Sequence, residues 1–221
     1  MSPSIQIDPQ LKDASSGKLV LGVLEAAVEV SQHDQALWQE IDDCVARLAK
    51  TPLESIASMT PVQALRATYK ALGTDPSRYR GSNEALLRRI VQGKGLYKVN
   101  TVVDINNLVS LESRRSVASY DRAKLGDRIV FRRGGEGESY ESIGKGVINV
   151  QDLPVFADEE GPFGSSTSDS QRAMITPQTA QLLMVIIGFD GEQGLPEQLA
   201  RAKGLLEKYA AARDVFGEIT V

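Results

Sequence analysis

The segment VVDINNLVSLE, Val102–Glu112, places Asp104, Asn106 and Asn107 inside an otherwise apolar stretch. Asx residues are poor helix and strand formers because their side chains compete for backbone hydrogen bonds. On a helix, Asp104 and Asn107 would project together, since residues three apart are neighbours. The residues that would face the core are Val102, Ile105 and Val109. The segment therefore predicts a buried helix whose Asx residues either serve a binding site or position the helix through hydrogen bonds.

The segments on either side of this helix favour an α+β protein. Helical periodicity predicts helices at 31–49, 61–72 (with Thr60 as N-cap), 82–93 (with Ser82 as N-cap) and 196–213. Apolar or alternating runs predict strands at 128–133, 138–144, 153–158 and, most strongly, 181–189. Residues 4–8 and 18–30 are read either as two strands or as a strand and the start of a short apolar helix. We expect a single domain over residues 1–221, with a mixed, mostly antiparallel sheet flanked by helices. Its parts would be an N-terminal part (1–75), a core (76–190) and a C-terminal helix (191–221).

Composition excludes several kinds of chemistry. The chain has one cysteine, Cys44, and one histidine, His33, so a Cys/His zinc site and an internal disulfide are not expected. His33 falls close to the N-cap of a predicted helix, where it would be an exposed residue of the first turn. No apolar run approaches the roughly 20 residues of a membrane-spanning helix, and the N-terminus does not resemble a secretory signal. These features fit a cytoplasmic protein without a metal or another cofactor.

The charge is unevenly distributed along the chain. The net charge is −4, yet residues 78–133 contain thirteen Lys and Arg against five Asp and Glu. Such a basic segment could focus an anionic partner onto one face, or its charges could be scattered over several faces and merely solvate them. The glycine-rich RRGGEGE, Arg132–Glu138, lacks the lysine and the strand-to-helix context of a phosphate-binding loop, and we expect a hairpin turn there.

An ordered series of short motifs resembles the B3/B4 domain of the phenylalanyl-tRNA synthetase beta subunit. The motifs are Val102-Val103-Asp104 with Asn107, Ser119-Tyr120-Asp121, Ile129–Arg132 with Glu136-Gly137-Glu138, VFADEEG at 155–161 and ITPQTAQLLMVI at 175–186. The likeness covers roughly residues 80–190. In the synthetase, this domain is similar to a hydrolase that removes a wrongly attached amino acid, chiefly tyrosine, from the tRNA 3′ end. The resemblance implies a free-standing editing domain with a pocket for an aminoacyl-adenosine.

The resemblance also implies where that pocket lies. Asn107 matches the asparagine that contacts the amino acid, and Asp104 would hold the helix or its neighbours in place. Ala118 stands where bacterial synthetases of the family carry a pocket histidine. The acidic residue that reads the tyrosine hydroxyl would fall in the Ser/Gly-rich segment 161–171, which we expect to be a loop. That segment offers Ser165, Ser166, Thr167, Ser168 and Asp169, and such a lining would suit a small or polar amino acid.

Hydrolysis of an activated ester needs little beyond a positioned water and oxyanion donors. Backbone N–H groups of residues 161–168 could be such donors, so the catalytic groups stay open. Residues that could hold the RNA are Arg80, Arg114, Arg115, Arg132 and Arg133, with Arg78 as a further arginine, and Tyr79, Tyr97 or Tyr120 could stack a terminal adenine.

Two main functions remain open at this stage. One is a trans-acting deacylase that clears mischarged tRNA in translation quality control. The other is a tRNA- or amino-acid-binding module that does not hydrolyse, as Ala118 would allow. A weaker third is an interaction protein that dimerises through its C-terminal end, where Phe216 and Ile219 are candidate contacts.

Overall fold

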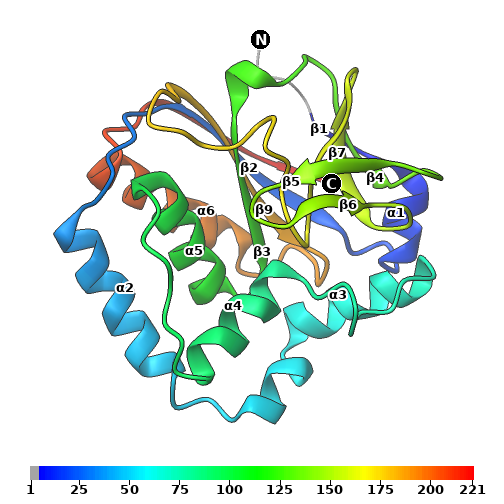
Figure 1. The fold of residues 1–221 in the computed structure, drawn as a ribbon, viewed down its shortest axis with the longest axis horizontal. Helices are drawn as coiled ribbons and strands as arrows, with labels where there is room; N and C mark the ends of the chain where they lie inside the picture. The colour runs from blue at the N-terminus through cyan, green and yellow to red at the C-terminus, as the bar shows by residue number, and fades with distance from the viewer. Residues whose placement is uncertain (1–4) are drawn as a thin grey trace.

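An antiparallel sheet of strand order β10-β2-β9-β3 runs through the centre of the molecule (Figure 1). The computed structural model describes residues 5–221, so Ser4, the first residue of the strand expected at 4–8, lies outside them. The four strands are β2 (Val20–Ala27), β3 (Ser116–Asp121), β9 (Gln181–Gly188) and β10 (Arg213–Thr220). Alternate residues of β2 and β9 point to opposite faces of this sheet. The sheet therefore separates two hydrophobic cores.

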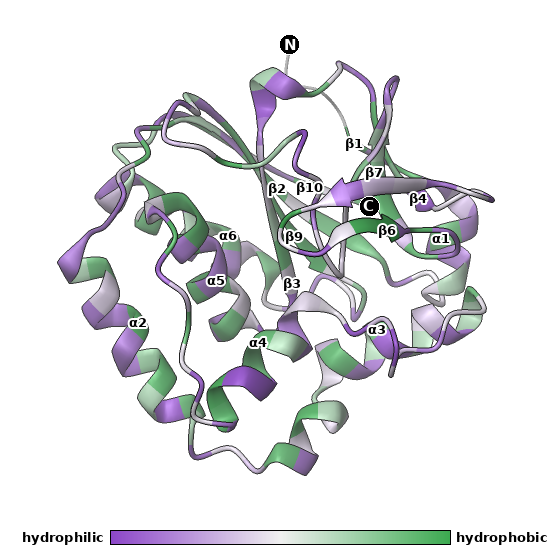
Figure 2. Cartoon of the chain, in the orientation of Figure 1, coloured by the Kyte–Doolittle hydropathy of each residue, from purple (hydrophilic) through white to green (hydrophobic). Residues whose placement is uncertain are grey.

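Helices cover one face of the central sheet. They are α2 (Gln35–Leu48), α4 (Ser82–Val91), α5 (Thr101–Ser113) and α6 (Leu195–Tyr209). Leu24 and Met184, which are paired across β2 and β9, pack into the core beneath these helices. Figure 2 shows alternating hydrophobic and hydrophilic patches along α2, as expected for a helix with one buried side. No helix among residues 5–221 is both long enough and apolar enough to cross a bilayer.

A second sheet covers the other face, in the order β1-β4-β7-β8. Its strands are β1 (Ile5–Ile7), β4 (Ile129–Arg133), β7 (Pro154–Asp158) and β8 (Gly161–Ser165). The β1–β4 pair is parallel and the remaining pairs are antiparallel. The helices α1 (Pro9–Ala14) and α3 (Thr60–Ala71) close this core, into which Tyr120 and Val185 project from the central sheet. The layers are thus helices, sheet and sheet.

Short elements complete the fold. A hairpin of β5 (Ser139–Ser142) and β6 (Gly146–Asn149) lies in front of both sheets in the view of Figure 1. Two 3-10 helices, η1 (Leu53–Ser58) and η2 (Arg122–Lys124), follow α2 and β3. The expected α+β class with a mixed, mostly antiparallel sheet is confirmed.

Several expected boundaries were wrong. The C-terminal helix ends at Tyr209, because Ala211 adopts a positive φ of 46° that an α-helix does not contain, and the chain then forms β10 from Arg213 to Thr220. Gly161–Ser165 is strand β8, so only the second half of the expected loop is irregular. Arg132 and Arg133 are the last residues of β4, and residues 134–138 connect it to β5 in a different sheet, so Arg132–Glu138 is not a hairpin turn.

Two expected helix caps were also wrong. Met59 and Gly81 are the N-caps of α3 and α4, and neither makes a side-chain capping bond. Thr60 and Ser82 begin the helices instead.

Candidate functional site

A cavity of about 460 Å³ opens between α4, α5 and β3, the edge strand of the central sheet. Its walls come from α4, α5, β3, the β5–β6 turn and the segment 165–169. The polar side chains that line it include Arg89, Asn106, Asn107, Ser119, Thr167 and Asp169. The apolar wall includes Leu86, Val103, Val117, Ala118, Ile143 and Ile175. A cavity of this size with few polar groups on apolar walls is typical of a small-molecule site.

Two tyrosine hydroxyls form hydrogen bonds with the segment 165–169. Tyr69 of α3 and Thr167 share a hydrogen bond of 2.8 Å between their hydroxyl oxygens. Tyr140 of β5 donates its hydroxyl hydrogen to the backbone oxygen of Ser168. Burial raises the pKa of both phenols, so they remain protonated donors at neutral pH.

The hydroxyl of Ser165 organises the same segment from within. Its Oγ accepts hydrogen bonds from the backbone N–H groups of Thr167 and Ser168 at 3.2 and 3.1 Å, and it donates to the Ser168 oxygen at 2.9 Å. Two of the N–H groups that we expected to be oxyanion donors are thus already used. Ser166 is buried and does not line the cavity, although its backbone oxygen accepts a hydrogen bond from the Ser82 N–H at the start of α4.

Asp169 is the acidic residue of the cavity wall. Its Oδ1 accepts a 2.8 Å hydrogen bond from the hydroxyl of Tyr120, and its backbone oxygen accepts one from the Ile143 N–H of the β5–β6 turn. Burial raises the pKa of the Asp169 carboxyl to about 7, although the Tyr120 hydrogen bond acts in the opposite direction. A carboxyl with such a pKa can exchange a proton near neutral pH, which an ordinary surface aspartate cannot.

The helix α5 contributes the asparagines. Asn107 lines the cavity, as does Ala118 on the neighbouring strand β3. Asn106 lines it too, and its side-chain oxygen accepts a 2.9 Å hydrogen bond from the Ser119 hydroxyl. The sequence pointed to Asn106 only as one of three Asx residues and to Ser119 only as part of a motif, and neither was expected to line the cavity. Each was adjacent to a selected residue, but only the packing of α5 on β3 brings the two together.

Asp104 does not line the cavity. Its two carboxylate oxygens accept hydrogen bonds from the indole Nε1 of Trp38 at 2.7 Å and from the Val99 N–H at 3.1 Å. Burial raises the pKa of the Asp104 carboxyl above its usual value, and the Trp38 hydrogen bond offsets only part of this increase. Asp104 thus fixes α2 and the segment before α5 against one another. Of the two roles expected for the Asx residues of Val102–Glu112, Asp104 has the positioning role.

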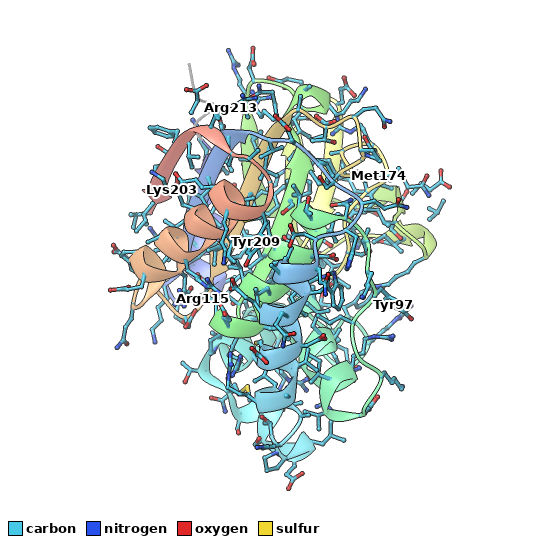
Figure 3. The ribbon with its side chains drawn as sticks, turned by 90° about the vertical axis from the view of Figure 1, so that its left-hand side faces the viewer. Tyr97, Arg115, Met174, Lys203, Tyr209 and Arg213 are labelled. Atoms are coloured by element: carbon cyan, nitrogen blue, oxygen red, sulfur yellow. The ribbon has the colours of Figure 1, made fainter. Side chains whose placement is uncertain are left out.

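Exposed apolar side chains surround the mouth of the cavity. Tyr97 is 67% exposed, and Val99, Ile143 and Met174 are exposed to a lesser degree. The guanidinium carbon of Arg89 lies 3.9 Å from the centre of the Tyr97 ring, a cation–π contact. Figure 3 shows Tyr97 and Met174 on the same side of the molecule, with Arg115 on the opposite side toward α6.

Two of the expected RNA-binding residues are buried. Arg115 is 2% exposed, and it makes a bidentate contact with Asp190 at 2.9 and 3.0 Å. Tyr120 is 0% exposed and packs edge-on against Phe163. Neither residue can contact a phosphate or stack on a base without unfolding of its surroundings, so these two expectations were wrong.

The remaining expected arginines lie at separate places. Arg132 pairs with Glu138 through two hydrogen bonds of 2.8 and 2.7 Å, and Arg133 pairs with Asp152 at 2.6 Å. Arg114 is the C-cap of α5 in the left-handed region at φ 62°. The basic segment 78–133 is therefore not a single patch; Arg80, which the sequence did select, lies beside α4 with Arg66 and Arg88.

Comparison with known proteins places this geometry in context. The model of the B3/4 domain family matches residues 64–198, which include all of the cavity walls. The phenylalanine–tRNA ligase beta subunit of Symbiobacterium thermophilum is 29% identical over 113 residues, which are 50% of this chain and 13% of that protein. The beta subunit from Streptomyces avermitilis is 32% identical over 80 residues, 35% of this chain and 10% of that protein.

A solved structure also matches most of the chain. The N-terminal fragment of the phenylalanyl-tRNA synthetase beta-subunit from Pyrococcus horikoshii aligns with 99% of this chain and 54% of that chain, at 12% identity and a TM-score of 0.47. The matches to the two ligase subunits span a small fraction of their length.

Proposed function

Since this chain belongs to the B3/4 domain family, we propose that its cavity binds the aminoacylated 3′ end of a tRNA and that the protein hydrolyses the ester of mischarged tRNA in trans. One observation carries the proposal. Asn107 of α5, Ala118 of β3 and Asp169 after β8 line a single cavity inside the matched residues.

The cavity suits one amino acid and part of the adenosine that carries it. Its volume of about 460 Å³ falls in the range of roughly 300–1,000 Å³ that is usual for small-ligand sites. The polar groups Asn107, Thr167 and Asp169 provide hydrogen-bond partners for an amino acid, and the apolar wall takes up its aliphatic or aromatic part. Tyr97 is exposed at the mouth of the cavity and can stack a terminal base. Tyr120 cannot stack a base, because it is buried.

The chemistry does not use an imidazole from the cavity wall. Ala118 stands at the position of the family histidine, and His33 is an exposed residue just before α2. Asp169 can take the place of a base, because a carboxyl with a pKa of about 7 can accept a proton from an attacking water at neutral pH. The Tyr120 hydroxyl would hold that carboxylate in position through its hydrogen bond of 2.8 Å.

A binding module without hydrolysis is the second candidate. It is favoured by the hydrogen bonds that Ser165 accepts from the Thr167 and Ser168 N–H groups, because those groups are then not available to an oxyanion. The two candidates differ in turnover. An enzyme releases free amino acid in amounts above its own concentration, and a binding module retains the ligand stoichiometrically.

The deciding experiment is a deacylation screen. Purified protein is incubated with tRNAs that carry Tyr, Ser, Thr, Ala and other near-miss amino acids, and the release of free amino acid is measured. Asn107→Ala should lower kcat/KM for any hydrolysed ester, and the decrease should correspond to a loss of about 1–3 kcal/mol of transition-state binding. Asn149→Ala, an exposed asparagine of β6, is the matched control and should leave the rate unchanged. If no tRNA in the panel is hydrolysed, the deacylase is ruled out and the binding module becomes the better account.

A further inference from the structure

Three arginines converge on one buried carboxylate beside the cavity. Glu84 of α4 is 1% exposed, and its oxygens lie 3.0 Å from Arg66 Nη1, 3.4 Å from Arg80 Nε and 2.7 Å from Arg88 Nε. The Arg66 Nη1 group donates to both carboxylate oxygens, at 3.2 and 3.0 Å. Three guanidinium groups and one carboxylate leave this cluster with an excess of two positive charges.

The excess charge faces the solvent. The side chains of Arg66, Arg80 and Arg88 are 26%, 42% and 24% exposed, and they cover the carboxylate of Glu84. An approaching anion therefore meets guanidinium groups and not the carboxylate. Each guanidinium has five N–H donors in a planar fork, of which the contacts with Glu84 use only a part, so the outer donors can bind oxygen atoms of an anion.

The backbone holds the arginines together. Gly81 precedes α4, and a Cβ atom there would lie 2.3 Å from a methyl group of Leu65 in α3. The absence of a side chain at Gly81 lets α3 approach the start of α4, which places Arg66 of one helix against Glu84 of the other. The cluster defined by Arg66, Arg80, Arg88 and Glu84 is thus a rigid feature of the α3–α4 contact.

The cluster is adjacent to the cavity. Ser82 and Arg89, which line the cavity, belong to the same helix as Glu84 and Arg88. Arg80 is two residues from Ser82, so their Cα atoms are at most about 7 Å apart. An anion bound at the cluster would therefore lie next to a ligand that enters the cavity.

We propose that Arg66, Arg80 and Arg88 bind the phosphodiester backbone of the RNA strand whose 3′ end enters the cavity. The identity of this anion as tRNA rests on the proposed function. Guanidinium groups bind phosphate oxygens in a bidentate manner, and a strand that leads into the cavity brings its phosphates past the start of α4. Arg115, Arg132 and Arg133 do not take part, because each is paired one-to-one with its own carboxylate and such a pair has no excess positive charge, whereas three arginines share Glu84.

Binding of uncharged tRNA tests this proposal, because it requires no ester hydrolysis. The affinity of labelled tRNA is measured by fluorescence anisotropy between about 50 and 200 mM salt for the wild type and for Arg80→Gln. The variant should bind more weakly and its plot of log affinity against log salt should be less steep by about 0.7–0.9, the loss of one phosphate contact. Arg80→Lys keeps the charge and should restore the slope.

The control is Arg213→Gln, which removes the same charge at an exposed position of β10, far from α4 (Figure 3). It should leave the slope unchanged. If Arg80→Gln and Arg213→Gln lose the same amount of tRNA affinity and salt slope, the proposal is overturned. It is also overturned if a folded Arg80→Gln keeps the wild-type slope, or if the wild type does not bind uncharged tRNA. A wild type that hydrolyses esters while Arg80→Gln binds tRNA normally would refute the arginine site alone. A reduced slope without any hydrolysis would support that site and refute only the deacylase.

Discussion

The hydroxyl of Tyr120 donates a 2.8 Å hydrogen bond to the carboxylate of Asp169, and it does so from a ring that is fully buried between the two sheets. Gly164 makes this position possible, because a Cβ atom there would lie 2.0 Å from the Tyr120 oxygen. Phe163 packs edge-on against the same ring, with centroids 4.9 Å apart. The core between the sheets thus fixes the orientation of an acidic group in the cavity wall.

The titration of Asp169 should be visible in the pH dependence of stability. Burial raises the pKa of its carboxyl from 3.8 to about 7, so the protonated form favours the folded state. This contribution is fully present below about pH 4 and is lost as the pH rises through about 7. Asp169→Asn cannot ionise and should therefore be more stable than the wild type at pH 8, by about 1–3 kcal/mol, with the difference disappearing near pH 4.

Urea unfolding of both proteins at several pH values checks this expectation. Asp127→Asn is the matched control, because the Asp127 side chain is fully exposed, and it should show no such difference. A variant at Asp169 whose stability differs from that of the wild type by the same amount at pH 4 and pH 8 would mean that the pKa of the carboxyl is not raised in the folded state.

Asp104 should contribute to stability and not to a catalytic step. Asp104→Ala leaves the Trp38 indole N–H and the Val99 N–H without their acceptor, and the loss should cost about 2–4 kcal/mol. Trp38 is the single tryptophan of the chain, so its fluorescence reports both the unfolding transition and the local change. Unchanged stability together with lost ester hydrolysis would instead place Asp104 in the substrate site.

The elements with strong periodicity could be predicted from the sequence, and the edge elements could not. The run 181–189 is apolar because β9 is central and buried on both faces, which makes the strand easy to recognise. β10 is an edge strand with a register shift between Arg213 and Phe216, and most of its residues remain partly exposed, so it shows no clear alternation. β8 is short and begins directly after a turn at 159–160, with Gly161 at a positive φ of 112°, and its serine and glycine residues suggested a loop.

The cavity lining could be predicted in large part from the sequence, but the RNA-binding arginines could not. The family motifs indicated Asn107, Ala118 and the segment 165–169, and all but Ser166 of that segment line the cavity. The RNA-binding arginines were harder to predict, because a count of charges along the chain does not show which carboxylate each arginine pairs with in the fold. Arg115 meets Asp190, seventy-five residues later, and only the fold brings these two side chains together.

Arg115 provides a test of that correction. Its guanidinium contacts Asp190, the Gln198 side chain and the backbone oxygens of Gly191 and Gln193. Arg115→Ala should lower the free energy of unfolding by about 3–5 kcal/mol, since it leaves a carboxylate without its partner in a largely buried setting. The remaining folded fraction should bind tRNA with an unchanged salt slope. A reduced slope with normal stability would restore Arg115 as an RNA contact.

Tyr97 should matter for the nucleoside and not for the fold. Its ring is 67% exposed and lies over Arg89, so Tyr97→Ala should leave the free energy of unfolding nearly unchanged. If the ring stacks the terminal adenine, the variant should lose about 1–3 kcal/mol of affinity for aminoacyl-adenosine analogues, measured by calorimetry, and Tyr97→Phe should retain most of it. Val147→Ala, at an exposed apolar residue of β6 that does not line the cavity, is the control. Because stacking requires a planar ring and not a hydroxyl, equal losses in Tyr97→Ala and Tyr97→Phe would show that the tyrosine hydroxyl binds the ligand instead.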